Sequence, residues 1–138
     1  QDTLCVVCPE AHALAACESL EWGDLIDLPL ILLRPGTGLR DLMEKPMQRW
    51  SGQLRVEYEV SNINTAIGLI CAGLGISVLP AYIMAQTGVT GVVARPLHNP
   101  QVSREVVALF DPARPLSNAA EAFLNRFRKF AAQALIVS

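Results

Sequence analysis

The sequence predicts an α/β domain built on a mainly parallel sheet. Short apolar runs of strand length alternate along the chain with segments of helical spacing, in the order strand, helix, strand, helix, strand. Helices between successive strands are the crossovers that parallel strands need. A chain of 138 residues with 51% hydrophobic residues is long enough to bury its own core. No repeat, low-complexity tract or linker interrupts it, so we expect one compact unit.

The first third of the chain contains two strand-like runs and one helical pattern. Residues 4–8 are apolar and β-branched, and a proline follows them, which predicts a strand. Ser19 is expected to cap a short turn, and residues 28–33 form a second strand-like run. Residues 39–50 then show helical spacing. Pro46 is expected to kink or end this helix near residue 44 or 45, because proline has no amide hydrogen.

The middle of the chain predicts a strand, a helix and a second strand in succession. Residues 54–60 alternate apolar and charged side chains, which indicates a half-exposed strand near a sheet edge. A helix over residues 63–72 follows, with Ser61 or Asn62 as its cap. Residues 76–79 are typical of a short buried strand, and Pro80 is expected to open another helical turn.

Two strands and a helix are predicted for the last third. Residues 92–97 and 105–110 are the expected strands, and a polar loop joins them. Ser117 or Asn118 is expected to cap a final amphipathic helix whose phenylalanines lie on one side. The uncharged stretch 63–86 is long enough to span a bilayer, but glycines and a proline interrupt it. A buried helix, turn and strand explain it better, so we expect no membrane partner.

Charge and composition narrow the classes of function. Thirteen acidic and eleven basic residues give a net charge of −2, which argues against a nucleic-acid-binding surface on this segment. The sequence begins at Gln1, and no basic segment precedes an apolar one, so we see no signal peptide. We therefore expect a piece of a longer cytoplasmic protein.

The four cysteines do not form a convincing metal pattern. Cys5 and Cys8 have the CxxC spacing, but Cys17 and Cys71 lie far apart, and no second close pair accompanies them. Residues three apart on a strand point to opposite faces, so one metal ion could not easily take both. Cysteine is also a common small core residue. We expect structural cysteines here, with no metal and no cofactor.

Two segments are candidates for binding a small anion. Gly36-Thr37-Gly38 follows a strand and precedes a helix, so free amide groups and the positive helix end favour an anion or carboxylate, with the Thr37 hydroxyl as an added donor. The segment matches neither the dinucleotide fingerprint nor the P-loop, and a plain turn is an equal alternative. Ser61-Asn62 offers a second helix N-terminus after a strand. Two such ends at one sheet edge favour a ligand cleft.

Catalysis finds little support in the sequence. His12 and His98 have no visible partner, and no serine lies in a nucleophile elbow. No carboxylate pair or nucleophile–base pair is evident. We therefore predict no catalytic residue and no enzyme.

Several segments resemble the effector-binding domain of LysR-type transcriptional regulators. Residues 9–15 resemble its PxxHPLA segment, residues 25–33 its strand entry, and residues 38–42 the helix after its effector loop. The most specific similarity joins residues 60–63 and 72–80, which resemble its "vss…aGlGialLP" signature. The similarity covers nearly the whole chain.

The resemblance implies a type II periplasmic-binding-protein-like fold, with two lobes around an effector cleft. Residues 6–94 or so would be the second lobe. Residues 1–5 and 95–138 would be the crossover strands and part of the first lobe, including the C-terminal helix. The N-terminal winged helix-turn-helix would be absent from this chain. DNA would then be bound only through that missing domain, and self-association as a dimer or tetramer would belong to the full-length protein.

The resemblance also implies a function and a set of site residues. A small anionic metabolite would bind the domain and control DNA binding and transcription. A periplasmic solute-binding lobe, or an enzyme of the same fold, is the alternative. A glycine stands where redox-sensing members carry a reactive cysteine, so peroxide sensing is not expected. The ligand-binding residues carried over are Arg34, Pro35, Gly36, Thr37, Gly38, Ser61, Asn62 and Ile63.

Overall fold

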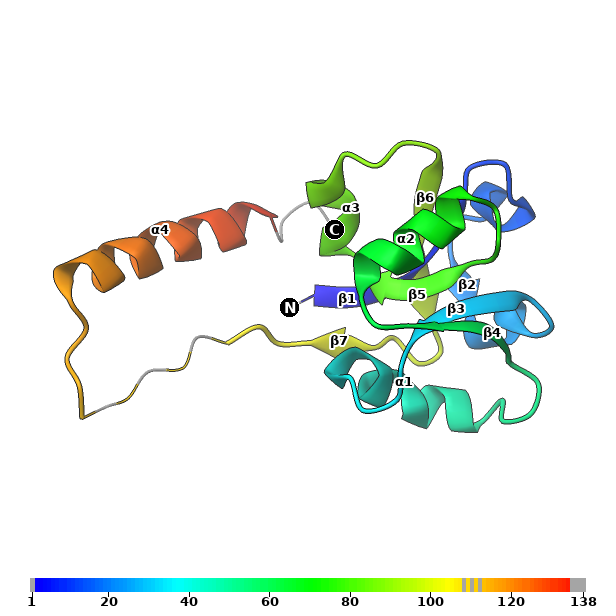
Figure 1. Cartoon of the computed structure of the whole chain (residues 1–138), viewed down its shortest axis with the longest axis horizontal. Helices are drawn as coiled ribbons and strands as arrows, with labels where there is room; N and C mark the ends of the chain where they lie inside the picture. Colours follow the sequence, from blue (N-terminus) through cyan, green and yellow to red (C-terminus); the bar gives the residue numbers. More distant parts are fainter. Residues whose placement is uncertain (1, 108, 110, 112, 135–138) are drawn as a thin grey trace.

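The structure is a computed structural model that describes residues 2–107, 109, 111 and 113–134, leaving aside the side chains of residues 85–87 and 131–134. Most of the chain folds into one α/β lobe, and α4 lies outside it (Figure 1). The elements, in chain order, are β1 (Asp2–Pro9), η1 (Ala13–Ala16), β2 (Leu20–Glu21), η2 (Trp22–Leu25), β3 (Pro29–Leu33), α1 (Gly38–Gln48), β4 (Arg55–Val60), α2 (Ile63–Cys71), β5 (Ser77–Pro80), α3 (Tyr82–Thr87), β6 (Val92–His98), β7 (Ser103–Arg104) and α4 (Asn118–Ala134).

The sheet is mixed, so the prediction of a mainly parallel sheet is wrong. β1 lies between β5 and β6 and runs antiparallel to both, and β7 also pairs antiparallel with β1. Only β2 with β6 and β3 with β4 are parallel neighbours. A parallel bridge between Leu30 and Ile76 joins the β3–β4 pair to the larger sheet. Apolar runs identify buried strands but carry no signal of direction, so the sequence could not show that β1 is reversed.

The core fills both sides of this sheet. Buried residues include Val6 on β1, Ile31 on β3 and Val78 on β5, each 0–1% exposed. α1 packs on β3, whereas α2 packs on β3, β1, β4 and β5. In Figure 1 the two helices lie on opposite sides of β3. Right-handed crossovers require this, because the chain moves outward from β3 to β4 and then back past β3 to β5.

The middle of the chain follows the predicted pattern. β4 has one neighbour, β3, among the described strands, and most of its residues are exposed, which confirms the half-exposed edge strand. α1 differs from expectation because it continues to Gln48, beyond Pro46. Pro46 is buried and lies in the last turn. There the ring costs one hydrogen bond near the helix end and buries apolar surface in return.

Two predicted caps are wrong. Glu21, not Ser19, precedes η2, and its amide donates to Asp24 Oδ2 at 2.8 Å, as in a capping box. Pro80 does not open a helical turn, because it ends β5 opposite Leu4. Glu21 pairs with His98 and Pro80 pairs with Leu4, so each of these two residues belongs to a strand just before a helical segment begins.

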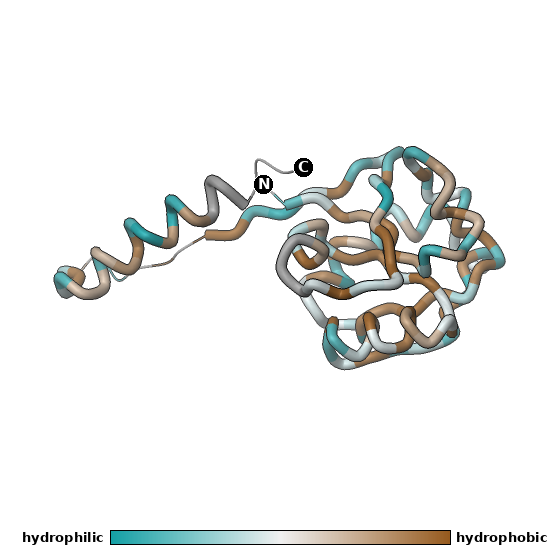
Figure 2. Tube along the Cα trace, turned by 90° about the horizontal axis from the view of Figure 1, so that it is seen from above, coloured by the Kyte–Doolittle hydropathy of each residue, from teal (hydrophilic) through white to brown (hydrophobic). Residues whose placement is uncertain are grey.

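The C-terminal part extends away from the lobe. The strand predicted over residues 105–110 is not formed at 105–107 or 109, whereas 108 and 110 lie outside the described residues. The ladder to β1 ends after Ser103–Arg104, so Val106, Val107 and Leu109 are 69%, 65% and 90% exposed. Figures 1 and 2 show this segment and α4 lying beside each other, apart from the lobe.

α4 forms where the sequence predicts it. Ser117 is the cap, since its Oγ accepts a hydrogen bond from the Ala120 amide at 3.2 Å. Phe123 and Phe127 stack with ring centroids 6.1 Å apart. Both rings and Phe130 are exposed, at 70%, 41% and 57%. No helix in the described part of the chain is long and apolar enough to cross a membrane.

Candidate functional site

The two predicted loops meet at one edge of the sheet. β3 and β4 are parallel, and their last residues, Leu33 and Val60, are register partners. The amide of Arg34 then donates to the Val60 carbonyl at 3.0 Å. The segments that follow β3 and β4 therefore leave the sheet side by side and enter α1 and α2. The two helix N-termini thus lie at one end of the lobe.

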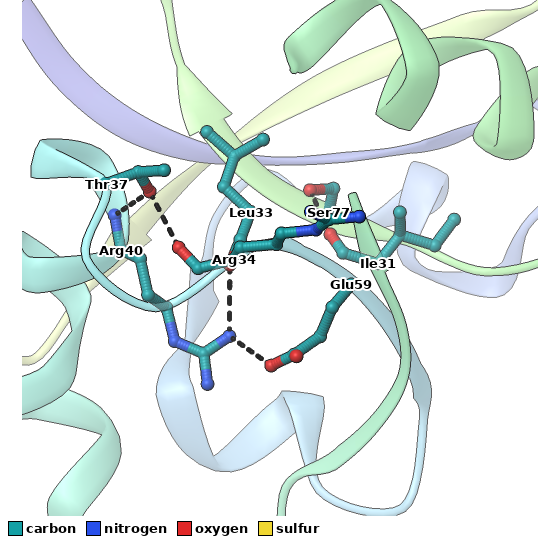
Figure 3. A network of polar contacts seen from close by, with 7 residues as sticks. All are labelled: Ile31, Leu33, Arg34, Thr37, Arg40, Glu59 and Ser77. Atoms are coloured by element: carbon teal, nitrogen blue, oxygen red, sulfur yellow. Dashed lines mark hydrogen bonds and ion pairs between the residues drawn. The ribbon is translucent and has the colours of Figure 1, made fainter. Parts of the chain in front are cut away.

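Thr37 caps α1, and its hydroxyl makes hydrogen bonds within its own loop. Thr37 Oγ1 accepts from the Arg40 amide at 3.3 Å and donates to the Arg34 carbonyl at 3.0 Å (Figure 3). The proton of the Thr37 hydroxyl is therefore already donated to the Arg34 carbonyl. The additional donor to a ligand that we expected from Thr37 is not available in this structure. The donors that remain are the amides at the start of α1, positions that have no partner within a helix. Gly36, with φ of 80°, shapes the turn before them.

Asn62 caps α2, so of the two predicted cap residues, Ser61 and Asn62, it is Asn62 that holds this position. Its Oδ1 accepts from the Thr65 amide at 2.9 Å and from Thr65 Oγ1 at 3.1 Å. Ser61 next to it is exposed and is not the cap. Ile63, the first residue of α2, is half-buried. This loop therefore offers the amides of the first helical turn and, in Ser61, an exposed hydroxyl.

Two arginines lie near these loops and have different surroundings. Arg34 is exposed, and its guanidinium has no hydrogen bond or ion pair with any residue that the structure describes. Arg40 is largely buried, with 13% of its side chain exposed. Its Nη1 donates to the Leu33 carbonyl at 3.3 Å and lies 3.6 Å from Glu59 Oε1. Sequence analysis missed Arg40 and Glu59, although Thr37 at a cap position marks Arg40 as the residue whose amide it receives.

The predicted residues line an open surface in this chain. Six of the eight are exposed, and Thr37 and Ile63 are half-buried. A groove of about 380 Å³ lies between α1 and the turn at residues 50–54, and Arg40 is among the residues that line it. None of the eight predicted residues lines it, so the groove is distinct from the predicted site.

The cysteines and histidines are not gathered into a reactive cluster. Cys5 and Cys8 are buried in β1 as expected, but Cys17 and Cys71 are exposed, so the core prediction is wrong for those two. Burial, and secondarily the charge of Asp2, raises the pKa of the Cys5 thiol to about 12. In the described part of the chain no three His, Cys, Asp or Glu side chains are grouped to hold a metal ion.

Both histidines have structural surroundings. His12 caps η1, and its Nδ1 accepts from the Leu14 amide at 3.2 Å. His98 ends β6 opposite Glu21 and so lies on a strand, not in the loop that the sequence indicated. Neither side chain lies among the residues that line the two loops.

The geometry defines an α/β lobe with two helix N-termini at one sheet edge. Comparison with known proteins identifies its family, because the model of the LysR substrate binding domain matches residues 1–132. The chain belongs to this family. A relative is the uncharacterized HTH-type transcriptional regulator YbhD of Escherichia coli (strain K12), 33% identical over 118 residues. The match covers 86% of this chain but 37% of the relative, so the chain spans well under half of that protein.

Solved structures support the same fold. HinK, a LysR family transcriptional regulator from Pseudomonas aeruginosa, matches with a TM-score of 0.74 and 19% identity, covering 91% of this chain and 44% of that one. The Synechocystis PCC6803 CcmR regulatory domain in complex with 2-PG matches with a TM-score of 0.67 and 24% identity, over 91% and 61% of the two chains. The fold is therefore of the type II periplasmic-binding-protein-like class.

Proposed function

We propose that this chain is part of the effector-sensing domain of a LysR-type transcriptional regulator, and that it binds a small anionic metabolite at residues 34–38 and 61–63. The carrying observation is the convergence of two helix N-termini beside an exposed arginine, Arg34, whose guanidinium has no partner among the described residues. Helix N-termini present unpaired amide donors and a partial positive charge, which together favour a carboxylate or phosphate.

The charges around the two loops support an anion over a cation. Arg34 supplies an exposed guanidinium next to the start of α1, whereas the Arg40 guanidinium is largely buried. Glu59 offsets part of this charge, but it is paired with Arg40. A guanidinium and backbone amides can bind one carboxylate from two sides, which fixes its orientation as well as its charge.

The rest of the proposal concerns the intact protein. Residues 6–94 or so would form the second lobe, and residues 1–5 and 95–138 would supply crossover strands and part of the first lobe. We propose that DNA is bound by a domain outside this chain, that the full-length protein is a dimer or tetramer, and that it works in the cytoplasm. Its relatives are transcriptional regulators, which supports a sensor over an enzyme or a secreted solute-binding protein.

Calorimetric titration of the intact regulator tests the proposed site. Related domains have been solved with shikimate, 2-PG and benzoate, so these three compounds are the first probes. Arg34→Ala should weaken binding of the compound that binds by about tenfold to a hundredfold, the range for loss of a charged hydrogen bond. Arg55→Ala is the matched control, because Arg55 is exposed and pairs on the surface with Glu57. Equal affinity of Arg34→Ala and the wild type would contradict the site.

A further inference from the structure

We infer that Arg40 and Glu59 form a clamp that sets the spacing between the two ligand loops, which makes Arg40 a positioning residue of the site. This inference rests on the proposed function and adds to it a residue that does not itself touch the ligand. It is built from contacts that join three segments of the chain: the end of β3, the start of α1 and the end of β4.

The first half of the clamp holds α1 to the end of β3. The Arg40 amide donates to Thr37 Oγ1, and the side chain turns back so that Nη1 donates to the Leu33 carbonyl. Thr37 in turn donates to the carbonyl of Arg34, the next residue after β3. The loop from Arg34 to Arg40 is therefore closed on itself by three hydrogen bonds of 3.0–3.3 Å.

The second half of the clamp reaches the neighbouring strand. The same Nη1 atom of Arg40 lies 3.6 Å from Glu59 Oε1, on the residue before the last of β4 (Figure 3). Val60 follows and accepts the Arg34 amide at 3.0 Å. The Arg40 side chain thus contacts both β3 and β4, close to the points where these strands end and the segments leading to α1 and α2 begin.

The arginine of this contact is largely buried, whereas Glu59 is 47% exposed. The Arg40 side chain is 13% exposed, whereas the exposed pair Arg55–Glu57 on the same strand leaves 60% of its arginine in solvent. Exposed pairs contribute little, because water screens them and the side chains lose entropy. The Arg40 guanidinium is held in one place by its surroundings, and its buried Nε has no partner among the described residues.

A fixed spacing matters because two helix ends must reach one small ligand. A binding site works when its donors are held within about 0.5 Å of the productive geometry by supporting residues. α1 and α2 lie on opposite sides of β3, so contacts at the ends of β3 and β4 must hold the two N-termini together. The Arg34–Val60 backbone bond and the Arg40–Glu59 contact do so. Arg34 then remains free to contact the ligand, and Arg40 supports the frame.

The test compares Arg40→Gln, Arg40→Lys and Glu59→Gln with Arg55→Gln in the intact regulator. Shikimate, 2-PG and benzoate are titrated into each protein, and amide hydrogen exchange is followed without ligand at residues 34–38 and 61–63. We expect Arg40→Gln and Glu59→Gln to weaken binding by about twofold to thirtyfold, the range for residues that act through others. We expect both loops, including residues 61–63, to exchange faster. Arg40→Lys should recover part of the lost affinity, because its ammonium keeps the attraction to Glu59, and Arg55→Gln should match the wild type.

Three outcomes separate the clamp from the proposed function. If Arg40→Gln weakens binding but leaves exchange at residues 61–63 unchanged, Arg40 contacts the ligand directly and the clamp is wrong. If neither affinity nor exchange changes in Glu59→Gln, whose side chain is 47% exposed in the wild type, the clamp is also wrong. If none of the three compounds binds the wild type while exchange in both loops still rises in the variants, the clamp holds and the proposed ligand class fails.

Discussion

Gly75 is the position where one added methyl group should cost most. A Cβ built on Gly75 would lie far inside the contact distance of the Pro29 carbonyl oxygen and 3.2 Å from a side-chain carbon of Ile31. Hydrogen bonds to residues 76 and 77 prevent β3 from moving easily away from Gly75. The Ile76 amide donates to the Pro29 carbonyl at 3.0 Å, the Ile31 amide to the Ile76 carbonyl at 2.8 Å, and Ser77 Oγ to the Ile31 carbonyl at 2.5 Å. Gly75→Ala must therefore push these two strands apart.

The expected loss follows from two terms. Overpacking a close contact costs about 1–3 kcal/mol. Displacing Pro29 also weakens the bond from Ile76, whose net contribution is about 0.5–1.5 kcal/mol. Gly75→Ala should thus lower the free energy of unfolding by about 2–4 kcal/mol. With a urea dependence of about 2 kcal/mol per molar, the middle of the usual range, the unfolding midpoint should fall by about 1–2 M.

Urea unfolding followed by circular dichroism measures this loss, and the chain offers a matched control. Gly68 lies inside α2 with nothing within 4 Å of a built Cβ. Gly68→Ala should stabilise the protein by up to about 1 kcal/mol, because alanine is the better helix former. A Gly75→Ala midpoint within 0.3 M of the wild type would refute the close-approach argument, since the same substitution would then be harmless at both sites.

Two further predictions concern buried titratable groups. Arg104→Gln should destabilise the protein by about 1–3 kcal/mol in urea unfolding, because Asp2 is 4% exposed and its Oδ2 lies 2.8 Å from Arg104 Nε. Arg114→Gln, in an exposed pair, should change stability by less than about 0.5 kcal/mol, and equal losses in the two variants would contradict the burial argument. Burial raises the pKa of the Cys5 thiol from 9.0 to about 12, so the unfolded chain releases this proton first and stability should fall as pH rises from 9 to 12. Unfolding measured across this range should show a smaller fall in Cys5→Val, and an identical fall would exclude Cys5 as a cause.

Those elements of the fold were predictable that depend on the conformational preferences of a few neighbouring residues. The alternation that ends at Val60 marked an edge strand, and Asn62 marked the start of α2, because both effects act within a few residues. Strand direction was not predictable, since β1 is antiparallel to β5 and β6 only by virtue of partners far along the chain. The strand expected over residues 105–110 failed for a related reason. Apolar β-branched residues favour a strand, but the ladder to β1 stops at Arg104.

In the candidate site, too, local features were predictable from the sequence, whereas contacts between distant segments were not. Glycines around Thr37 indicated a helix N-terminus after a strand, and α1 begins there, at Gly38, with Thr37 as its cap. The direction of the Thr37 hydroxyl was missed, because its acceptor, the Arg34 carbonyl, becomes available only when the loop closes. Arg40 and Glu59 were missed because their contact joins two strands, and no spacing rule connects residues on different elements.

The sequence by itself determined that this chain is an α/β domain with two strand-to-helix loops, because caps, glycines and periodicity act locally. Its motifs also indicated the family to which it belongs. Only the tertiary structure decided that β1 is reversed and that both loops leave the sheet side by side. It also decided that the Arg40 guanidinium contacts Leu33 and Glu59, whereas that of Arg34 contacts no side chain or backbone group in the described part of the chain by a hydrogen bond or ion pair. These features depend on which segments become neighbours, and that depends on how the whole chain buries its apolar surface.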